Sequence, residues 1–203
     1  MLIPPCASGC FIRTTPTNRS LKSARARHYA RLEVDTLAVA YHTGHRIGAI
    51  RQLRWSDVDL TKKEVRWRAE HDKIGRSHAT PISVDLAVML DREQKARKAR
   101  KEIGDGWLFP SPADPEKSCS RHIMRDWMER SLKTIGIARG ERYGWHSLRR
   151  QFATELKHVP LPDLCALGGW TDPQTILKCY ARPDVETMRA ALENRAQRVV
   201  SNG

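Results

Sequence analysis

The sequence predicts a mainly α-helical fold with a small antiparallel β-sheet, which is an α+β class. Several long segments carry apolar residues at helical spacing, and one short segment alternates polar with apolar residues as a half-buried strand does. At 203 residues with a hydrophobic fraction of 40%, the chain can form one core. We expect residues 23–203 to form one domain and residues 1–22, which show no apolar period, to form a disordered or remnant tail.

The charge of the chain favours a polyanionic partner. Its formal net charge is +13 and its isoelectric point is near 10.0. Each Lys or Arg that neutralises a phosphate releases a condensed counterion, so nucleic acid is the favoured partner. A membrane surface is not the favoured partner, because the sequence has no apolar run of about 18 residues and no lipidation signal. Five cysteines without a Cys-x-x-Cys pair favour reduced thiols in a cytoplasmic protein over a metal site.

The first helix is predicted over residues 22–41. Gly44 follows it as a C-cap, since glycine readily adopts the positive φ that such a turn requires. Arg46 then stands at the start of a helix over residues 47–53, where backbone amides also favour an anion. Arg46 is therefore either a phosphate ligand or a solvated arginine at a helix start.

The sheet is predicted from a hairpin. Residues 64–69 alternate polar and apolar, residues 79–82 form the partner strand, and a glycine marks the tip between them. Lys73 lies on this tip, with Lys62 and Lys63 as nearby alternatives for any catalytic lysine. The plainer interpretation is that Lys73 is an exposed lysine at the hairpin tip that contacts only the backbone.

The remaining helices have capping and breaking signals of their own. Ser83 can cap a helix over residues 84–102, and Ser118 or Ser120 can start one that ends near residue 135. The other predicted helices begin at Gly144, cover residues 161–167, and cover residues 184–200.

The helix after Gly144 carries a pair of candidate site residues. His146 and Arg149 are three positions apart and so share a helix face, while Leu148 and Phe152 form part of a buried stripe. Further along, a glycine pair ends the next helix and presents Trp170, and Tyr180 follows. A tryptophan after two glycines is more often a packing residue, but its indole N–H can also donate to a phosphate oxygen.

Taken together, the segments Thr43-Gly44-His45-Arg46, His146-Ser147-Leu148-Arg149, Leu167-Gly168-Gly169-Trp170 and Cys179-Tyr180 resemble the catalytic domain of the tyrosine recombinases, the phage integrase family. The family has an arginine after Thr-Gly, a lysine in a hairpin, His-x-x-Arg, a His or Trp after Leu-Gly, and a tyrosine nucleophile. In this chain the matching residues are Arg46, Lys73, His146, Arg149, Trp170 and Tyr180.

Two features depart from the family pattern. Ala49 occupies a position where the family commonly has an acidic residue that supports the first arginine. The interval from Trp170 to Tyr180 is one residue longer than the commonest spacing in the family.

The resemblance implies a site-specific recombinase or integrase that cleaves and rejoins double-stranded DNA through a 3′-phosphotyrosyl intermediate. Tyr180 would be the nucleophile, and Arg46, Arg149 and Trp170 would donate to the non-bridging phosphate oxygens.

Proton transfer is implied for the two remaining matches. His146 would manage the proton of the nucleophile, and Lys73 would protonate the leaving 5′ oxygen. This chemistry needs neither a metal nor a nucleotide, so we expect no cofactor.

The resemblance also bears on domains and partners. Family members usually carry a helical DNA-clamping domain before the catalytic one, and we expect this chain to lack it. We further expect a cytoplasmic, nucleoid-associated protein that self-associates on DNA through its C-terminal helix, although that helix could instead pack on its own chain. Two alternatives stay open: a type IB topoisomerase-like activity, and an inactive or truncated DNA-binding relic or regulator of the same fold.

Overall fold

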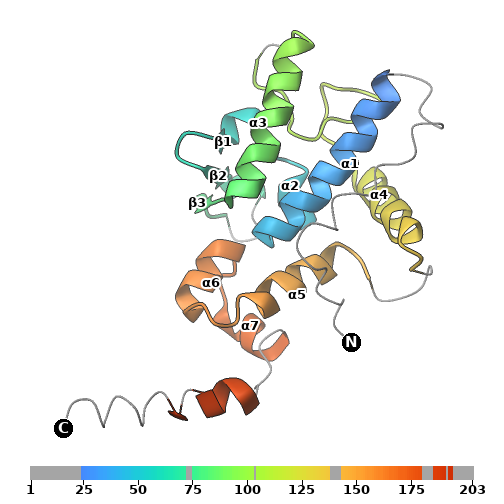
Figure 1. Ribbon diagram of the computed structural model, residues 1–203. Coiled ribbons are helices and arrows are strands. Elements are labelled where there is room, and N and C mark those ends of the chain that lie inside the picture. The colour runs from blue at the N-terminus through green and yellow to red at the C-terminus, as the bar shows by residue number, and fades with distance from the viewer. Residues whose placement is uncertain are drawn as a thin grey trace.

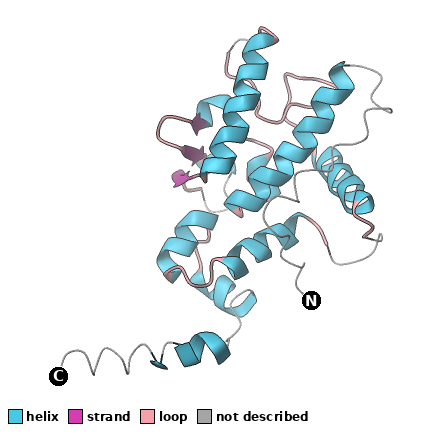
Figure 2. Cartoon of the chain, in the orientation of Figure 1, coloured by secondary structure: helices cyan, strands magenta, loops and turns pink. Residues whose placement is uncertain are grey.

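A computed structural model describes residues 24–71, 75–102, 104–137, 143–179, 185–190 and 192–193. Helices make up most of it, and a three-stranded antiparallel sheet lies at one side (Figures 1 and 2). The predicted α+β class is therefore confirmed.

Helix α1, Ala24–Thr43, is the centre of the fold. It contacts α2, α3, α4 and α5, and Figure 1 shows it crossing the upper part of the molecule between α3 and α4. Leu32, Ala38, Val39 and Ala40 are the apolar residues that it buries. The predicted cap at Gly44 is present with φ +63°, but α2 is a single turn, Ile47–Ile50, and ends before the predicted residue 53.

The sheet has the order β1-β2-β3, with strands Val58–Asp59, Glu64–Trp67 and His78–Pro81. The alternation in β2 buries Val65 and Trp67, as the sequence pattern predicts. The indole N–H of Trp67 donates to the Thr80 hydroxyl across the hairpin at 2.9 Å. Strand β1 was not predicted, because two residues are too few to show an alternation.

Helices α3, Val84–Ala99, and α4, Arg121–Thr134, pack on either side of α1 (Figure 1). Both begin with a serine whose hydroxyl accepts a backbone N–H, at 3.3 Å for Ser83 and 3.2 Å for Ser120. The choice between Ser118 and Ser120 is thus settled in favour of Ser120.

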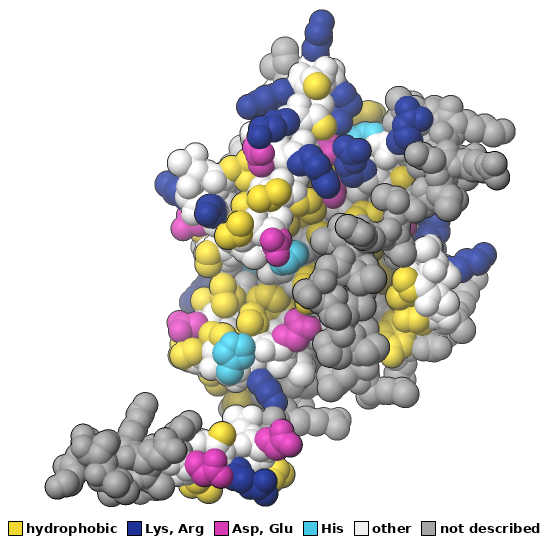
Figure 3. All heavy atoms as spheres, viewed as in Figure 1, with side chains coloured by type: hydrophobic (Ala, Val, Ile, Leu, Met, Phe, Trp, Pro, Cys, Tyr) yellow, Lys and Arg dark blue, Asp and Glu magenta, His cyan; other side chains and the backbone are white. Residues whose placement is uncertain are grey.

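Lys and Arg side chains gather over the C-terminal end of α3 and the start of α1 in the space-filling view (Figure 3). Several of these side chains are engaged in ion pairs: Lys95 of α3 lies 2.7 Å from Asp91, and Arg100, which follows α3, lies 2.8 Å from the buried Glu93. This end of α3 therefore carries less unbalanced positive charge than its sequence suggests.

The C-terminal half contains α5, Trp145–Glu155, α6, Leu161–Gly168, and α7, Pro173–Cys179. The main core cluster includes Leu148 of α5, whereas Phe152, one turn later, belongs to a second cluster with Leu164 and Ile176. Helix α5 thus joins two cores. Two of the candidate site residues, Arg149 and Trp170, lie at this junction.

The segment after α7 is only partly within the described residues. Residues 185–190 and 192–193 are helical, in agreement with the predicted helix over 184–200, and its other residues lie outside the described part. No helix in the described ranges has the length and apolar character needed to span a membrane.

Gly44 is a position where the fold depends on glycine. A Cβ there would overlap the ring of Phe152, and the positive φ is strained for any other residue. We expect Gly44→Ala to lower the free energy of unfolding by about 2–4 kcal/mol, as measured by urea denaturation. Gly48→Ala is the matched control, because a Cβ at Gly48 meets nothing within 4 Å. Equal midpoints for the two variants would contradict this assignment.

Candidate functional site

The structure describes four of the six predicted site residues: Arg46, His146, Arg149 and Trp170. Lys73 and Tyr180 lie outside the described residues. The four described residues are those predicted to bind the phosphate and to accept a proton.

Arg149 is held at the junction of the two cores. It projects from the middle of α5, is only 3% exposed, and donates from Nη1 to the carbonyl oxygens of Gly44 and Gly168. Its guanidinium carbon lies 3.8 Å from the ring centroid of Trp170. These contacts connect α5 with the ends of α1 and α6, so the guanidinium is fixed before any ligand binds.

Trp170 supports this arginine. The side chain is 5% exposed and lies in the second core cluster, with its ring centroid 6.4 Å from that of Phe152. A Cβ at Gly168 would overlap the indole, and Gly169 has φ +62°, so the glycine pair is what lets the chain turn so closely around Trp170. The packing role is thus observed, and donation to a phosphate stays a prediction.

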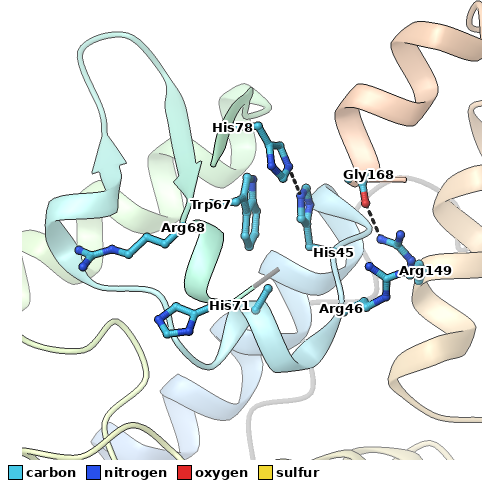
Figure 4. Close-up of a pocket in the computed structure, with 10 residues that line it drawn as sticks. His45, Arg46, Trp67, Arg68, His71, His78, Arg149 and Gly168 are labelled. Carbon is cyan, nitrogen blue, oxygen red and sulfur yellow. Dashed lines mark hydrogen bonds between the residues drawn. The ribbon is translucent and has the colours of Figure 1, made fainter. Parts of the chain in front are cut away.

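Arg46 precedes α2 and is exposed. It lines the same pocket as Arg149, and Figure 4 shows both side chains at one side of that pocket. Since α2 has only one turn, its backbone amides add less to anion binding than the predicted longer helix would. The charge at this point comes mainly from the two guanidinium groups.

His146 stands in the first turn of α5 and is exposed. Neighbouring protein atoms shield part of its imidazole from water, which lowers the pKa below the ordinary 6.5, and the positive charges of Arg150, Arg149 and Arg46 lower it further. The ring is therefore neutral at pH 7 and able to accept a proton. His146 and Arg149 are three positions apart on α5 and so share a face of that helix.

The pocket between the sheet, α2 and α6 takes its positive charge mainly from Arg46 and Arg149, because the third lining arginine, Arg68, pairs with Asp57 at 2.7 Å and points away from them (Figure 4). Its described lining contains three arginines and three histidines and no carboxylate; the residues are His45, Arg46, Ala49, Trp67, Arg68, His71, His78, Arg149, Gly168 and Gly169. Such a lining suits a phosphate group. In the part of the chain that the structure describes, no three His, Cys, Asp or Glu side chains are grouped so that they could hold a metal ion.

Sequence reasoning missed His45 and His78. His45 is buried at 6% exposure in the turn before Arg46, and its ring stacks on Trp67 at 3.5 Å between centroids. His45 lies within the Thr-Gly-His-Arg segment and could have been considered with it. Nothing local in the sequence marks His78, because its role depends on a contact with a residue far away in the chain.

Comparison with known proteins identifies the family. The sequence profile of the Phage integrase family matches residues 13–187, which is most of the chain. The chain belongs to the phage integrase family. Two Pseudomonas relatives named for the tyrosine recombinase XerC are also similar to it. The one from P. syringae is 26% identical over 77% of this chain and 34% of its own length, and the one from P. aeruginosa is 28% identical over 79% and 38%.

Solved structures agree on the fold of this phage integrase family member. The crystal structure of XerA recombinase superposes with a TM-score of 0.63 at 18% identity, covering 81% of this chain and 57% of that one. The XerH recombinase bound to a palindromic difH substrate gives 0.64 at 21% identity, covering 84% and 46%. The Tn1549 transposon integrase in complex with transposon right end DNA gives 0.64 at 17% identity, covering 83% and 60%. The chain thus spans about a third of the length of the curated relatives and about half of these structures.

Proposed function

We propose that this chain is the catalytic part of a site-specific DNA recombinase or integrase, which cleaves and rejoins strands of double-stranded DNA. The observation that carries the proposal is the convergence of Arg46 and Arg149, from distant parts of the sequence, on one side of one pocket. His146 lies three positions before Arg149 on α5. Structures of similar fold in complex with DNA support the choice of substrate.

The reaction we propose is an in-line exchange at one phosphodiester. The Tyr180 oxygen attacks phosphorus, a 3′-phosphotyrosyl bond forms, and the bond from phosphorus to the 5′ oxygen breaks. His146 takes the proton of the Tyr180 hydroxyl, and Lys73 gives a proton to the leaving 5′ oxygen. Rejoining is the reverse reaction with a new 5′ hydroxyl. It needs no outside energy source, because the phosphotyrosyl link conserves the free energy of the phosphodiester bond that was broken.

Arg46 and Arg149 stabilise the negative charge that develops on the phosphate in this reaction. Negative charge grows on the non-bridging oxygens as Tyr180 attacks, and preorganised donors stabilise that charge more than they stabilise the ground state. Arg149 is preorganised by its two carbonyl contacts and its stacking on Trp170. We assign Trp170 chiefly the support of this guanidinium, with its predicted indole donation to phosphate as a finer contribution.

The proposed chemistry requires neither a metal nor ATP. The two positive charges that a metal ion would bring to the phosphate are available from Arg46 and Arg149.

We also propose that the partner is duplex DNA in the cytoplasm, at the nucleoid, and that copies of the chain associate there through the C-terminal helix. Val185, Met188 and Leu192 of that segment are exposed at 63%, 50% and 66%, which supports an apolar contact with a second protomer.

A suicide substrate tests the proposed function. A pool of nicked duplexes with randomised sequence around the nick, incubated in EDTA without nucleotide, should yield a DNA adduct of the chain that survives denaturant. Cleavage next to the nick releases a short fragment that carries the free 5′ hydroxyl. This fragment diffuses away, so the strand in the adduct cannot be rejoined to it. Binding without any adduct would instead support the relic or regulator alternative. That alternative draws on Ala49, which lines the pocket where the family commonly has an acidic residue.

His146 gives a pH prediction. Because its pKa lies below 6.5, the base form is present at pH 7 and is lost as the pH falls through that lowered value. With subsaturating DNA, the adduct formation rate of the wild type should therefore fall on the acid side with an apparent pKa below 6.5. His146→Gln should be slower and lack this acid limb. An unchanged acid limb in the variant would show that another group accepts the proton.

A further inference from the structure

Arg149 is held between two turns that are far apart in the sequence. Its Nη1 atom donates to the carbonyl oxygen of Gly44, which follows α1, and to that of Gly168, which ends α6. This nitrogen carries two N–H groups, one for each carbonyl, so both bonds form only while the two turns keep a fixed separation. The position of the guanidinium therefore depends on the contact that sets this separation.

The contact between the two turns is made by the residues that follow the two acceptors. His45 follows Gly44, and Gly169 follows Gly168. A Cβ on Gly169 would lie 3.0 Å from Nε2 of His45, so the backbone of one turn rests directly on the ring of the other. Figure 4 shows His45 between Trp67 and the hydrogen bond from Arg149 to Gly168. The imidazole is thus a spacer between the turns.

The ring of His45 is itself held by the sheet and by its own turn. It stacks on Trp67 of β2, with the ring centroids 3.5 Å apart and an interplanar angle of 5°. Its Nε2 lies 3.2 Å from Nε2 of His78, the first residue of β3, and its Nδ1 lies 3.0 Å from the carbonyl oxygen of Thr43. A ring that is fixed by three contacts can keep the two turns at one separation.

The protons of the two imidazoles follow from their neighbours. The Thr43 carbonyl can only accept, so Nδ1 of His45 carries a proton. Burial holds the pKa of His45 well below 6.5, and the nearby positive charges of Arg149 and Arg46 lower it further. The ring is therefore neutral at pH 7, and its Nε2 accepts from Nε2–H of His78. A neutral spacer can lie close to the guanidinium without repelling it.

We propose that His45 is a positioning residue for Arg149. Its ring sets the separation of the two carbonyl groups that accept from the guanidinium, and His78 holds the ring in place. The effect on cleavage rests on the proposed function, in which Arg149 stabilises the charge of the transition state. The effect on the guanidinium itself does not, so each effect has a measurement of its own.

The first measurement follows the guanidinium in the chain without DNA. Hydrogen exchange of the Arg149 side-chain N–H groups is read by NMR, and the signals are assigned by their absence from Arg149→Lys. Exchange in the wild type should be slow, because the side chain is 3% exposed and bonded to two carbonyl groups. His45→Ala should speed this exchange by about tenfold or more, because the two turns lose their spacer.

The second measurement is the rate of adduct formation on a duplex selected from the suicide pool, with saturating DNA. His45→Ala should be about 10- to 100-fold slower than the wild type, because a misplaced catalytic group loses rate steeply. In an Arg149→Lys background the same substitution should slow the reaction less than about threefold further, because the group that it positions is already lost. A ring that served stability alone would cost the same factor in both backgrounds.

Two further variants accompany His45→Ala. If that variant does not fold, His78→Ala removes the hydrogen bond to the ring from a half-buried position and should show both effects. Leu132→Ala is the control for stability, because Leu132 packs against the main core from α4 and has no part in the contact between the turns. It should leave the exchange of Arg149 unchanged and have the same effect on the rate in both backgrounds.

The outcomes separate this inference from the proposed function. Exchange in His45→Ala that matches the wild type, or a loss of rate that is equal in both backgrounds, would overturn the positioning role. A wild-type rate in His45→Ala beside a slow Arg149→Lys would reject that role too, and would retain Arg149 as a donor. A wild type that forms no adduct would reject the proposed function, whereas faster exchange in His45→Ala would still support the role of His45 in placing the guanidinium.

Discussion

Tyr180→Phe is expected to abolish the covalent DNA adduct while leaving the fold and the DNA affinity unchanged. The substitution removes one hydroxyl oxygen, which is the atom that attacks phosphorus, and leaves the charge of the pocket as it is. The measurement is a denaturing gel of the suicide reaction, together with a binding titration at the same salt concentration.

Tyr143→Phe is the matched control for this prediction, since Tyr143 lies close to His146 in the sequence and is partly buried. It should form the adduct at the wild-type level. A denaturant-resistant band that persists in Tyr180→Phe and disappears in Tyr143→Phe would move the nucleophile from one tyrosine to the other.

Arg149→Lys should lower the rate of adduct formation by about 10²- to 10³-fold, although it keeps the positive charge. An ammonium can neither donate in a planar fork nor stack over Trp170, and a buried lysine would leave the carbonyl oxygens of Gly44 and Gly168 less well satisfied. Single-turnover kinetics with saturating DNA isolates this loss from any change in affinity.

Arg150→Lys provides the comparison, because Arg150 is exposed on the same helix and donates to the Ser147 hydroxyl at 3.4 Å. We expect less than about a threefold change from it, as for other exposed substitutions. Thermal unfolding of both variants shows whether Arg149→Lys also weakens the junction of the two cores. A rate for a folded Arg149→Lys within threefold of the wild type would reject Arg149 as a transition-state donor.

The parts of the fold that sequence reasoning predicted are those with local causes. The serine caps of α3 and α4 and the positive φ of Gly44 follow from a few neighbouring residues. The alternation in β2 likewise places Trp67 inward within a single strand. Local signals also gave the wrong end for α2, because nothing within residues 47–53 shows that the helix stops after Ile50.

The parts that sequence reasoning missed depend on contacts between distant segments. The pairing of His45 with His78 and the burial of Arg149 against two carbonyl groups require the sheet, α1 and α6 to be assembled first. Trp170 illustrates the same limit: the motif predicted its place near the site, but only the packed second core shows that its ring lies against Arg149.

If this chain joins itself to DNA through one tyrosine, peptide mapping of the trapped adduct locates the bond. After nuclease and protease digestion, mass spectrometry should find a nucleotide attached through its 3′ phosphate to the peptide that contains Tyr180, with the other tyrosine peptides unmodified. A nucleotide on a different residue, or a selected duplex that binds tightly and never becomes attached, would show that Tyr180 is not the nucleophile.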